Sequence, residues 1–290
     1  VFAPAITAGG SLVTPIIPPG IALIIYGLVA DVSIGKMFIA GLVPGLLCAV
    51  VLMFTVYLVA RKTNAKPSRE SWPTGKEVVF SLGQAWPALF LIFAVVGGIR
   101  ANIFTPTEAG AVAVLIVLAI GFFIYREMRI SHVVKALGET ARATASVMLV
   151  IMASAALGWI FSMEHAGVAV ANFVTSLTEN KYMFLLIINI LLLTLGMFLE
   201  GNAILLILVP LLKPVVEHFG IDPVHFGIIM IFNLSIGAFT PPVGTVMLLV
   251  CNITQVSVGN FFKQSLPLLA ALLLMLMLVT YIPAISLFLV

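Results

Sequence analysis

Two short stretches of this sequence place hydroxyl side chains beside paired prolines, a combination that could bind a metal cation. They are residues 11–20, which read SLVTPIIPPG, and residues 235–244, which read SIGAFTPPVG. Proline lacks an N–H and clashes with the carbonyl four residues back, so it interrupts a helix and leaves backbone carbonyls unpaired. A small hard cation can use such carbonyls, with hydroxyl oxygens as further ligands. The hydroxyls available here belong to Ser11, Thr14, Ser235 and Thr240.

An acidic side chain interrupts another apolar region. Glu200 lies in residues 196–202, GMFLEGN. If the chain enters a membrane at Lys181, reaches mid-depth at Glu200 and returns by His218, residues 200–202 form the tip of a re-entrant hairpin. An ionisable group at that depth is costly and usually functional. The structural alternative is that Glu200 caps the helix that starts near Ala203.

The composition excludes most soluble proteins. Hydrophobic residues make up 62% of the 290 residues and charged residues 9%, against roughly 45 to 50% and about 25% in soluble domains. So few charges cannot cover a water-soluble surface, which argues against soluble enzymes and nucleic-acid-binding proteins. We therefore predict an all-α polytopic membrane protein that is surrounded by a lipid bilayer and has no nucleic-acid partner.

Charge-free intervals locate the expected spans, because about 20 apolar residues cross roughly 30 Å of hydrocarbon. The intervals without Asp, Glu, Lys or Arg that are long enough to consider are residues 1–30, 37–60, 78–99, 109–125, 143–163, 182–199, 223–262 and 264–290. Most are one span long. The interval 223–262 is too long for one simple span and contains the second proline pair, so we expect a broken helix there.

Lysine and arginine collect at residues 61–76 and 126–142, and short cytoplasmic loops are enriched in them. Both segments are therefore expected on the cytoplasmic side. This topology divides the chain into three parts: residues 1–60, the end of a first repeat with a broken helix at 1–30; residues 61–138, two spans with their basic loops; and residues 139–290, a second repeat. The second repeat is expected to contain a first span, an amphipathic arm at 165–180, the hairpin at 182–218, a broken helix at 223–254 and a last span at 260–290.

The two proline stretches belong to a longer internal similarity. Residues 32–38, VSIGKMF, resemble residues 256–262, VSVGNFF, at nearly the separation of the two proline pairs. Four predicted crossings lie between the copies, so the copies have opposite orientations. Such pairs are typical of inverted-repeat transporters, whose sites lie at discontinuous helices near the membrane midplane. The alternative is that proline and glycine merely kink two ordinary helices.

We do not expect the cysteines and histidines to form a metal site. Cys48 and Cys251 lie in apolar runs and are interpreted as small core residues. The four histidines are near predicted loops or span ends, where we expect them to be solvated: His132, His165, His218 and His225.

Several stretches together resemble the large membrane subunit of tripartite ATP-independent periplasmic (TRAP) transporters. They are residues 10–20, 104–110 (FTPTEAG), 196–202, and 220–227 (GIDPVHFG) leading to 240–244 (TPPVG). They occur in order and span essentially the whole chain. The resemblance implies an elevator-type, sodium-driven secondary importer of organic acids, not an enzyme, in the bacterial cytoplasmic (inner) membrane. It also implies two partners, a small membrane subunit and a soluble periplasmic substrate-binding protein.

The resemblance further implies the site residues. A first sodium site would use carbonyls around Gly10, Val13 and Pro15, with Ser11. A second would use the break around Ser235, Gly237 and Thr240, with the hairpin tip at Gly201 and Asn202. About two sodium ions are expected, and no organic cofactor. The substrate residues would be Thr14, Asn202 and Thr245. Residues 104–110 are interpreted as structural, with Thr105 or Thr107 capping a helix that Glu108 stabilises.

The sequence departs from the family before Val1, where the family has the rest of its first repeat, including a hairpin that would supply half of the first sodium site. We expect further residues there, with the small subunit fused upstream or supplied as another chain. The polar candidate lining suits a sialic or sugar acid, and C4-dicarboxylates remain open. Two other functions also remain open: a passive anion channel, and an intramembrane enzyme that uses Glu200 or His225 as acid or base.

Overall fold

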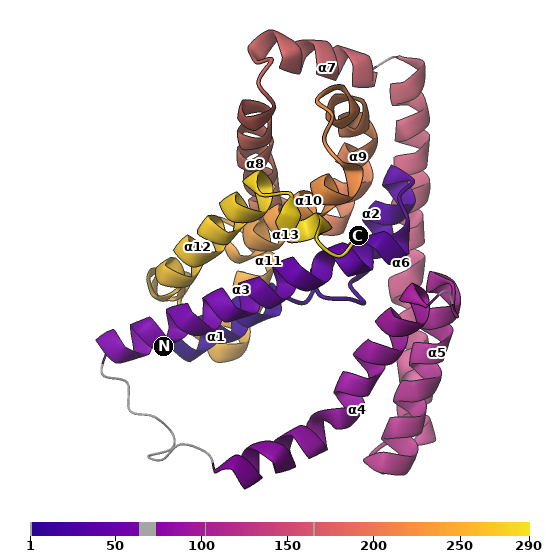
Figure 1. The fold of residues 1–290 in the computed structure, drawn as a ribbon, viewed down its shortest axis with the longest axis vertical. Coiled ribbons are helices and arrows are strands. Elements are labelled where there is room, and N and C mark those ends of the chain that lie inside the picture. Colours follow the sequence, from indigo (N-terminus) through magenta and orange to yellow (C-terminus); the bar gives the residue numbers. More distant parts are fainter. Residues whose placement is uncertain (1, 64–73, 102, 165) are drawn as a thin grey trace. The chain divides into compact units, whose positions relative to one another are not determined.

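The computed structural model describes residues 2–63, 74–101, 103–164 and 166–290, and all regular secondary structure in these ranges is helical (Figure 1). The helices, of which η1 is a π-helix, are α1 (Phe2–Ser11), α2 (Ile21–Ala30), α3 (Ile34–Lys62), α4 (Gly75–Arg100), α5 (Pro106–Ala119), η1 (Ile120–Ile124), α6 (Ile130–Met163), α7 (Ala166–Leu177), α8 (Lys181–Phe198), α9 (Gly201–His218), α10 (Pro223–Phe239), α11 (Thr245–Thr254), α12 (Val258–Tyr281) and α13 (Ala284–Leu287).

Six helical segments in the described residues are long and apolar enough to cross a membrane, or seven if the bent helix α4 is counted as one span. The prediction of an all-α protein with several spans is therefore confirmed. Helix α4 bends by 53° between its Gly75–Pro87 and Leu89–Arg100 parts, because Pro87 removes a helical hydrogen bond. Helix α6 begins at Ile130, so residues 130–138, which the basic residues place in a connecting loop, are helical.

The chain divides into two compact units. One consists of Val1–Thr63 and Val150–Val290, and the other of Asn64–Leu149. The first unit contains both proline-paired breaks and the segment around Glu200. The second contains α4, α5, η1 and the first part of α6.

Helix α10 is the core of the first unit. Fifteen of its residues are buried, and it packs against α3, α8, α9 and α12. Apolar residues predominate on all sides of it, as expected for a helix that is surrounded by other helices. The side chains of Phe226, Phe232 and Phe239 are among the largest that are fully buried.

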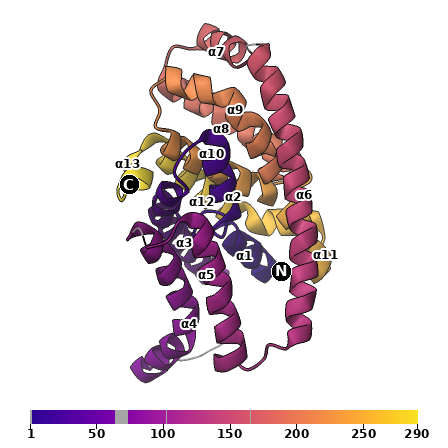
Figure 2. The ribbon, with the colours of Figure 1, turned by 90° about the vertical axis from the view of Figure 1, so that its right-hand side faces the viewer.

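Helix α7 lies across the ends of α8 and α9, as Figures 1 and 2 both show, and it packs against α9. It falls within the range that the sequence assigns to an amphipathic arm. Phe173 and Leu177 on this helix are exposed, which leaves apolar side chains available to a membrane interface.

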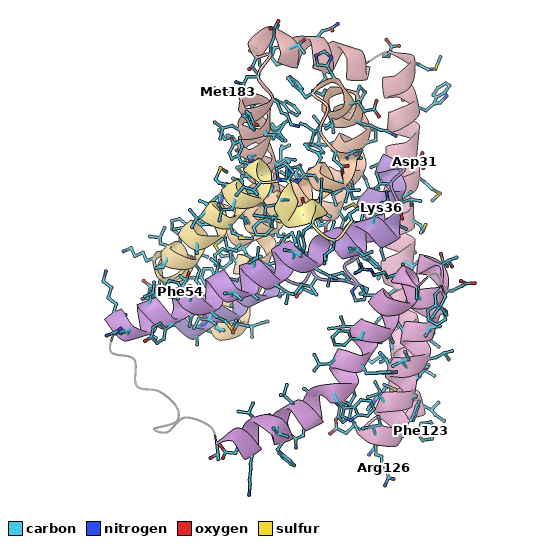
Figure 3. All side chains as sticks on the ribbon, in the orientation of Figure 1. Asp31, Lys36, Phe54, Phe123, Arg126 and Met183 are labelled. Carbon is cyan, nitrogen blue, oxygen red and sulfur yellow. The ribbon has the colours of Figure 1, made fainter. Side chains whose placement is uncertain are left out.

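Large apolar side chains also project from the outer faces of the spans. Phe54 on α3 is 61% exposed and Met183 on α8 is 50% exposed, and both are labelled in Figure 3. In water such surfaces would be unfavourable, but hydrocarbon accommodates them. Asp31 instead follows the end of α2, and Lys36 lies in the first turn of α3 (Figure 3).

In the second unit, helix α5 begins with a capping box. The Thr105 hydroxyl accepts from the backbone N–H of Glu108 at 3.3 Å, and the Glu108 carboxylate accepts from the backbone N–H of Thr105 at 2.8 Å. The sequence left Thr105 and Thr107 open as the cap, and the structure selects Thr105. This motif has the structural role that we expect of it.

Candidate functional site

The second proline-paired stretch separates α10 from α11. The backbone N–H of Thr240 donates to Gly237 rather than continuing the α-helical pattern, at 2.9 Å, and the chain resumes as a helix at Thr245. Gly244 has a φ of +43°. A Cβ atom added to Gly244 would lie 2.7 Å from the Thr240 carbonyl oxygen and 3.2 Å from that of Ala238. Two carbonyl oxygens therefore converge on a position that only glycine can occupy.

Helices α8 and α9 form a hairpin whose tip meets this break. The backbone N–H of Gly244 donates to the Met197 carbonyl at 3.1 Å. A Cβ on Gly196 would lie 3.2 Å from the Cα atom of Gly237, and one on Gly201 would lie 3.4 Å from Leu234 Cβ. Gly201 and Gly237, two predicted ligands of the second sodium site, therefore both lie where the hairpin contacts α10.

The two predicted hydroxyl ligands at the second break are nearly buried. Ser235 and Thr240 are each 8% exposed. Their hydroxyls donate to carbonyls one turn back, Ser235 to Ile231 and Thr240 to Ile236, both at 2.8 Å. A hydroxyl that donates its proton keeps acceptor lone pairs. Both oxygens can therefore still serve as ligands of a hard cation.

Glu200 caps helix α9. Its carboxylate accepts from the backbone N–H of Ala203 at 2.9 Å and from the Asn202 side-chain amide at 2.7 Å. This is the structural alternative that the sequence left open. Asn202 is half-buried beside the tip, whereas Thr245 is exposed at the start of α11.

The first proline-paired stretch, between α1 and α2, differs in part from the prediction of unpaired carbonyls. The carbonyls of Gly10, Ser11 and Val13 accept from backbone N–H groups three residues later, at 3.1 to 3.3 Å. The reason is that tight turns replace the α-helical pattern without leaving these oxygens free. A cation there would have to use the second lone pairs of Gly10 and Ser11, because the Val13 carbonyl also accepts from the backbone N–H of Ile17, at 3.0 Å.

The neighbours of this first break are on α2 and α3. The Pro15 carbonyl faces Gly20, and the Ile16 carbonyl faces Gly41 on α3. The Ser11 hydroxyl donates to Ala8 at 2.7 Å, and Thr14 is exposed. The first break therefore contacts α3 through Ile16, whereas the second break contacts the hairpin.

The two broken helices pass each other in opposite directions. Helix α1 packs against α11, and α2 packs against α10. Helix α1, which precedes the first break, thus neighbours α11, which follows the second break, and the same holds for α10 and α2. Both breaks contain a cis proline bond, at Pro18–Pro19 and at Pro241–Pro242.

Histidine and cysteine give a mixed outcome. Cys48 and Cys251 are buried, as predicted for core residues, and both are free cysteines. His225 is 2% exposed, so its prediction as a solvated residue is wrong. Its ring contacts the Ser286 hydroxyl at 2.7 Å and the Thr280 carbonyl at 3.3 Å. Within the described ranges, no three His, Cys, Asp or Glu side chains are grouped so that they could hold a metal ion. His165 lies outside these ranges.

Sequence reasoning also missed a buried polar cluster. Asn189, Asn233 and Thr280 come from α8, α10 and α12 and are at most 1% exposed. The only available signal was an amide side chain in the middle of a charge-free interval. Their hydrogen-bond partners are far away in the sequence, so the cluster could not be inferred from local spacing.

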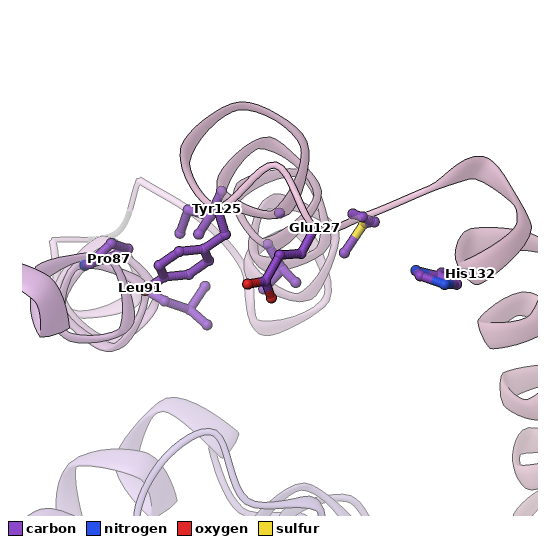
Figure 4. Close-up of a pocket in the computed structure, with 9 residues that line it drawn as sticks. Pro87, Leu91, Tyr125, Glu127 and His132 are labelled. Carbon is purple, nitrogen blue, oxygen red and sulfur yellow. The ribbon is translucent and has the colours of Figure 1, made fainter.

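A separate cavity of about 540 Å³ lies within the second unit. Figure 4 shows Tyr125 close to Pro87 and Leu91, with Glu127 and His132 also contributing to the lining. It contains none of the residues that the sequence predicts for ion or substrate binding.

Comparison with known proteins identifies the family. Residues 1–285 match the family described as tripartite ATP-independent periplasmic transporter, DctM component. The chain belongs to this family. Its members are transporter components rather than enzymes, so the resemblance found in the sequence is confirmed, and so is the prediction of a multi-pass membrane protein of a bacterial transporter family.

Relatives within the TRAP family have different named substrates. The chain is 39% identical to the sialic acid TRAP transporter large permease protein of Vibrio cholerae, over 99% of this chain and 67% of the relative. It is 39% identical to the C4-dicarboxylate TRAP transporter large permease protein of Pseudomonas aeruginosa, over 99% and 66%. It is 38% identical to the isethionate TRAP transporter permease protein DctMQ of Oleidesulfovibrio alaskensis, over 99% and 45%. The chain therefore spans about two thirds of the length of the first two relatives, and less than half of the third.

Proposed function

We propose that this chain carries the ion-binding and substrate-binding part of a sodium-coupled importer of organic acids in the bacterial cytoplasmic membrane. The observation that carries the proposal is the contact between the hairpin tip and the second break, through Gly244 and Met197. There the converging carbonyls of Ala238 and Thr240, the nearly buried hydroxyls of Ser235 and Thr240, and the hairpin backbone provide oxygen ligands of the kind that discontinuous helices offer to sodium.

The substrate is proposed to be a small organic anion that binds between the tip and the breaks. The named substrates of the three relatives are sialic acid, C4-dicarboxylates and isethionate, which share an anionic group. Helix N-termini favour such groups, and α9 and α11 begin beside the second break. Thr14, Asn202 and Thr245 are the proposed substrate contacts.

Sodium coupling has a clear energetic purpose. An organic anion cannot enter hydrocarbon unaided, and each positive charge that moves inward across 100 mV gains about 2.3 kcal/mol. Two sodium ions with one monoanion carry a net charge of about +1, so import would be electrogenic. The ions also neutralise the substrate before the loaded site crosses.

The proposed mechanism is elevator-type alternating access by an inverted repeat. Support comes from the opposite directions of the two broken helices and from the presence of both breaks and the hairpin in one compact unit. A small membrane subunit and a soluble periplasmic binding protein are the proposed partners. The name DctMQ and the 45% coverage of that relative fit a small subunit that is fused to the large one.

The test is uptake of labelled organic acids by proteoliposomes that contain the complete transporter. Saturable uptake that requires both sodium and the soluble binding protein is expected. Non-saturable flux without either would favour an anion channel and overturn the proposal. The intramembrane enzyme has less support, because both oxygens of Glu200 are engaged in capping α9 and holding Asn202.

A further inference from the structure

Three buried polar side chains connect the hairpin, the broken helix and the last span. The Asn233 side-chain amide donates to Asn189 Oδ1 at 2.6 Å, and the Asn189 amide donates to the Thr280 hydroxyl at 3.1 Å. The three residues belong to α10, α8 and α12 and are fully buried or nearly so. They are separate from the residues that we propose as sodium ligands.

A hydrogen bond to a backbone carbonyl fixes the orientation of the Asn233 amide, and with it the direction of these hydrogen bonds. Asn233 Nδ2 also donates to the Ile229 carbonyl at 2.8 Å, so a rotated amide would place two oxygens against each other. In this orientation Asn233 Oδ1 is buried without a hydrogen-bond partner among the described residues. An unsatisfied buried acceptor costs free energy. The unsatisfied acceptor therefore offsets part of the stability that the hydrogen bonds of the cluster provide.

The cluster begins a line of contacts that leads to the proposed sodium site. Between α8 and α10 the contacts are Asn189 with Asn233 and then Gly196 with Gly237, and just beyond the end of α10 Met197 contacts Gly244. The two helices therefore run in the same direction along this line. Close glycine contacts set the distance between helices, whereas a directional polar pair specifies which residues face each other.

We propose that Asn189, Asn233 and Thr280 are positioning residues that fix the register of α8 on α10, and so hold the hairpin tip against the second break. The part of this inference that concerns sodium affinity rests on the proposed function. Without the polar pair, α8 can shift along α10, and the tip no longer holds Gly201 against Leu234 beside the second break. Sodium affinity then falls although the core stays packed.

The first experiment measures sodium affinity in the complete purified transporter. The unfolding temperature is titrated with sodium chloride against choline chloride, and the sodium half-saturation of uptake is measured in parallel. Thr280→Val removes the hydroxyl but keeps the shape of the side chain, whereas Thr280→Ser keeps the hydroxyl. The third variant combines Asn189→Leu with Asn233→Leu. The matched control is Thr194→Val on α8, where the hydroxyl is exposed and donates only to Ile190 of its own helix, at 2.7 Å.

Thr280→Val and the double variant are expected to raise the sodium half-saturation about tenfold, the size of effect seen when residues that orient metal ligands are lost. Thr280→Ser and Thr194→Val should match the wild type. The sodium-free unfolding temperature of the double variant should be unchanged or higher. A lower sodium-free unfolding temperature with an unchanged sodium half-saturation would show a merely structural role and overturn the inference.

A second experiment tests the register without sodium. Spin labels at Phe198→Cys and Leu249→Cys, both exposed positions, report the distance between the end of α8 and α11 in a background with Cys48 and Cys251 replaced by alanine. The double leucine variant should broaden or shift this distance distribution, and an unchanged distribution overturns the inference. If the wild type shows no sodium dependence, the proposed function fails, while this measurement still decides the register.

Discussion

A Cβ atom added to Gly237 would lie 2.6 Å from the carbonyl carbon of Gly196. The backbones of α10 and α8 are therefore in direct contact one turn before the break, and no side chain fits between them. Met197 and Gly244 form a hydrogen bond just beyond this point. The position of the hairpin tip therefore depends on the close contact between Gly196 and Gly237.

Gly237→Ala is expected to separate α8 from α10, because the methyl group meets backbone rather than a movable side chain. Overpacking of this kind costs roughly 1 to 3 kcal/mol, which should appear as a lower unfolding temperature of the purified transporter and weaker sodium-dependent uptake. Gly259→Ala is the control, since nothing lies within 4 Å of its Cβ position. Equal unfolding temperatures for the two variants would contradict the close contact.

Ser235→Ala combined with Thr240→Ala removes both hydroxyls from the second break. We expect a higher sodium half-saturation of uptake, because two oxygen ligands are lost while the backbone carbonyls remain. Thr254→Ala is the control, because its hydroxyl makes the same kind of bond one turn back, to Val250 at 2.7 Å, at an exposed position. An unchanged sodium titration in the double variant would count against the second site.

The positions of the two helix breaks follow from the sequence, because proline acts on its own helix. Helix α10 ends at Phe239 and α11 begins at Thr245, on either side of Pro241 and Pro242. The cap at Thr105 is local in the same way. What the sequence could not show is how the carbonyls of Gly10 and Val13 pair within the first break, because a proline stretch predicts that a helix ends but not which turns replace it.

His225 shows a second limit. It lies near a helix start, where histidines are usually solvated, but its ring contacts residues 55 and 61 positions later in the chain. Local spacing carries no information about such partners. The same applies to Asn189 and Asn233, whose burial depends on how α8 and α12 pack around α10.

Thr105→Ala should loosen the first turn of α5. It removes the hydroxyl that accepts from the Glu108 N–H, which typically costs about 0.5 to 2 kcal/mol. Hydrogen exchange at the first amides of α5 is the measurement, and faster exchange is expected. Thr107→Ala is the matched control, because Thr107 is the neighbouring threonine that the structure does not use as the cap. Equal exchange in both variants would show that the capping box does not hold this helix start.

Substitution of Glu200 separates a capping role from a chemical one. Glu200→Gln keeps an oxygen that can accept from Ala203, and its amide can pair with Asn202 after a rotation of that side chain, so most sodium-dependent uptake should remain. Glu200→Ala removes both bonds and should cost about 1 kcal/mol, with a lower unfolding temperature and reduced uptake because the tip loses its order. A proton-transferring Glu200 makes a different prediction, since glutamine and alanine would then abolish activity equally. Uptake and unfolding temperature measured on both variants therefore decide between the two roles, and a fully inactive but stably folded Glu200→Gln would contradict the capping role.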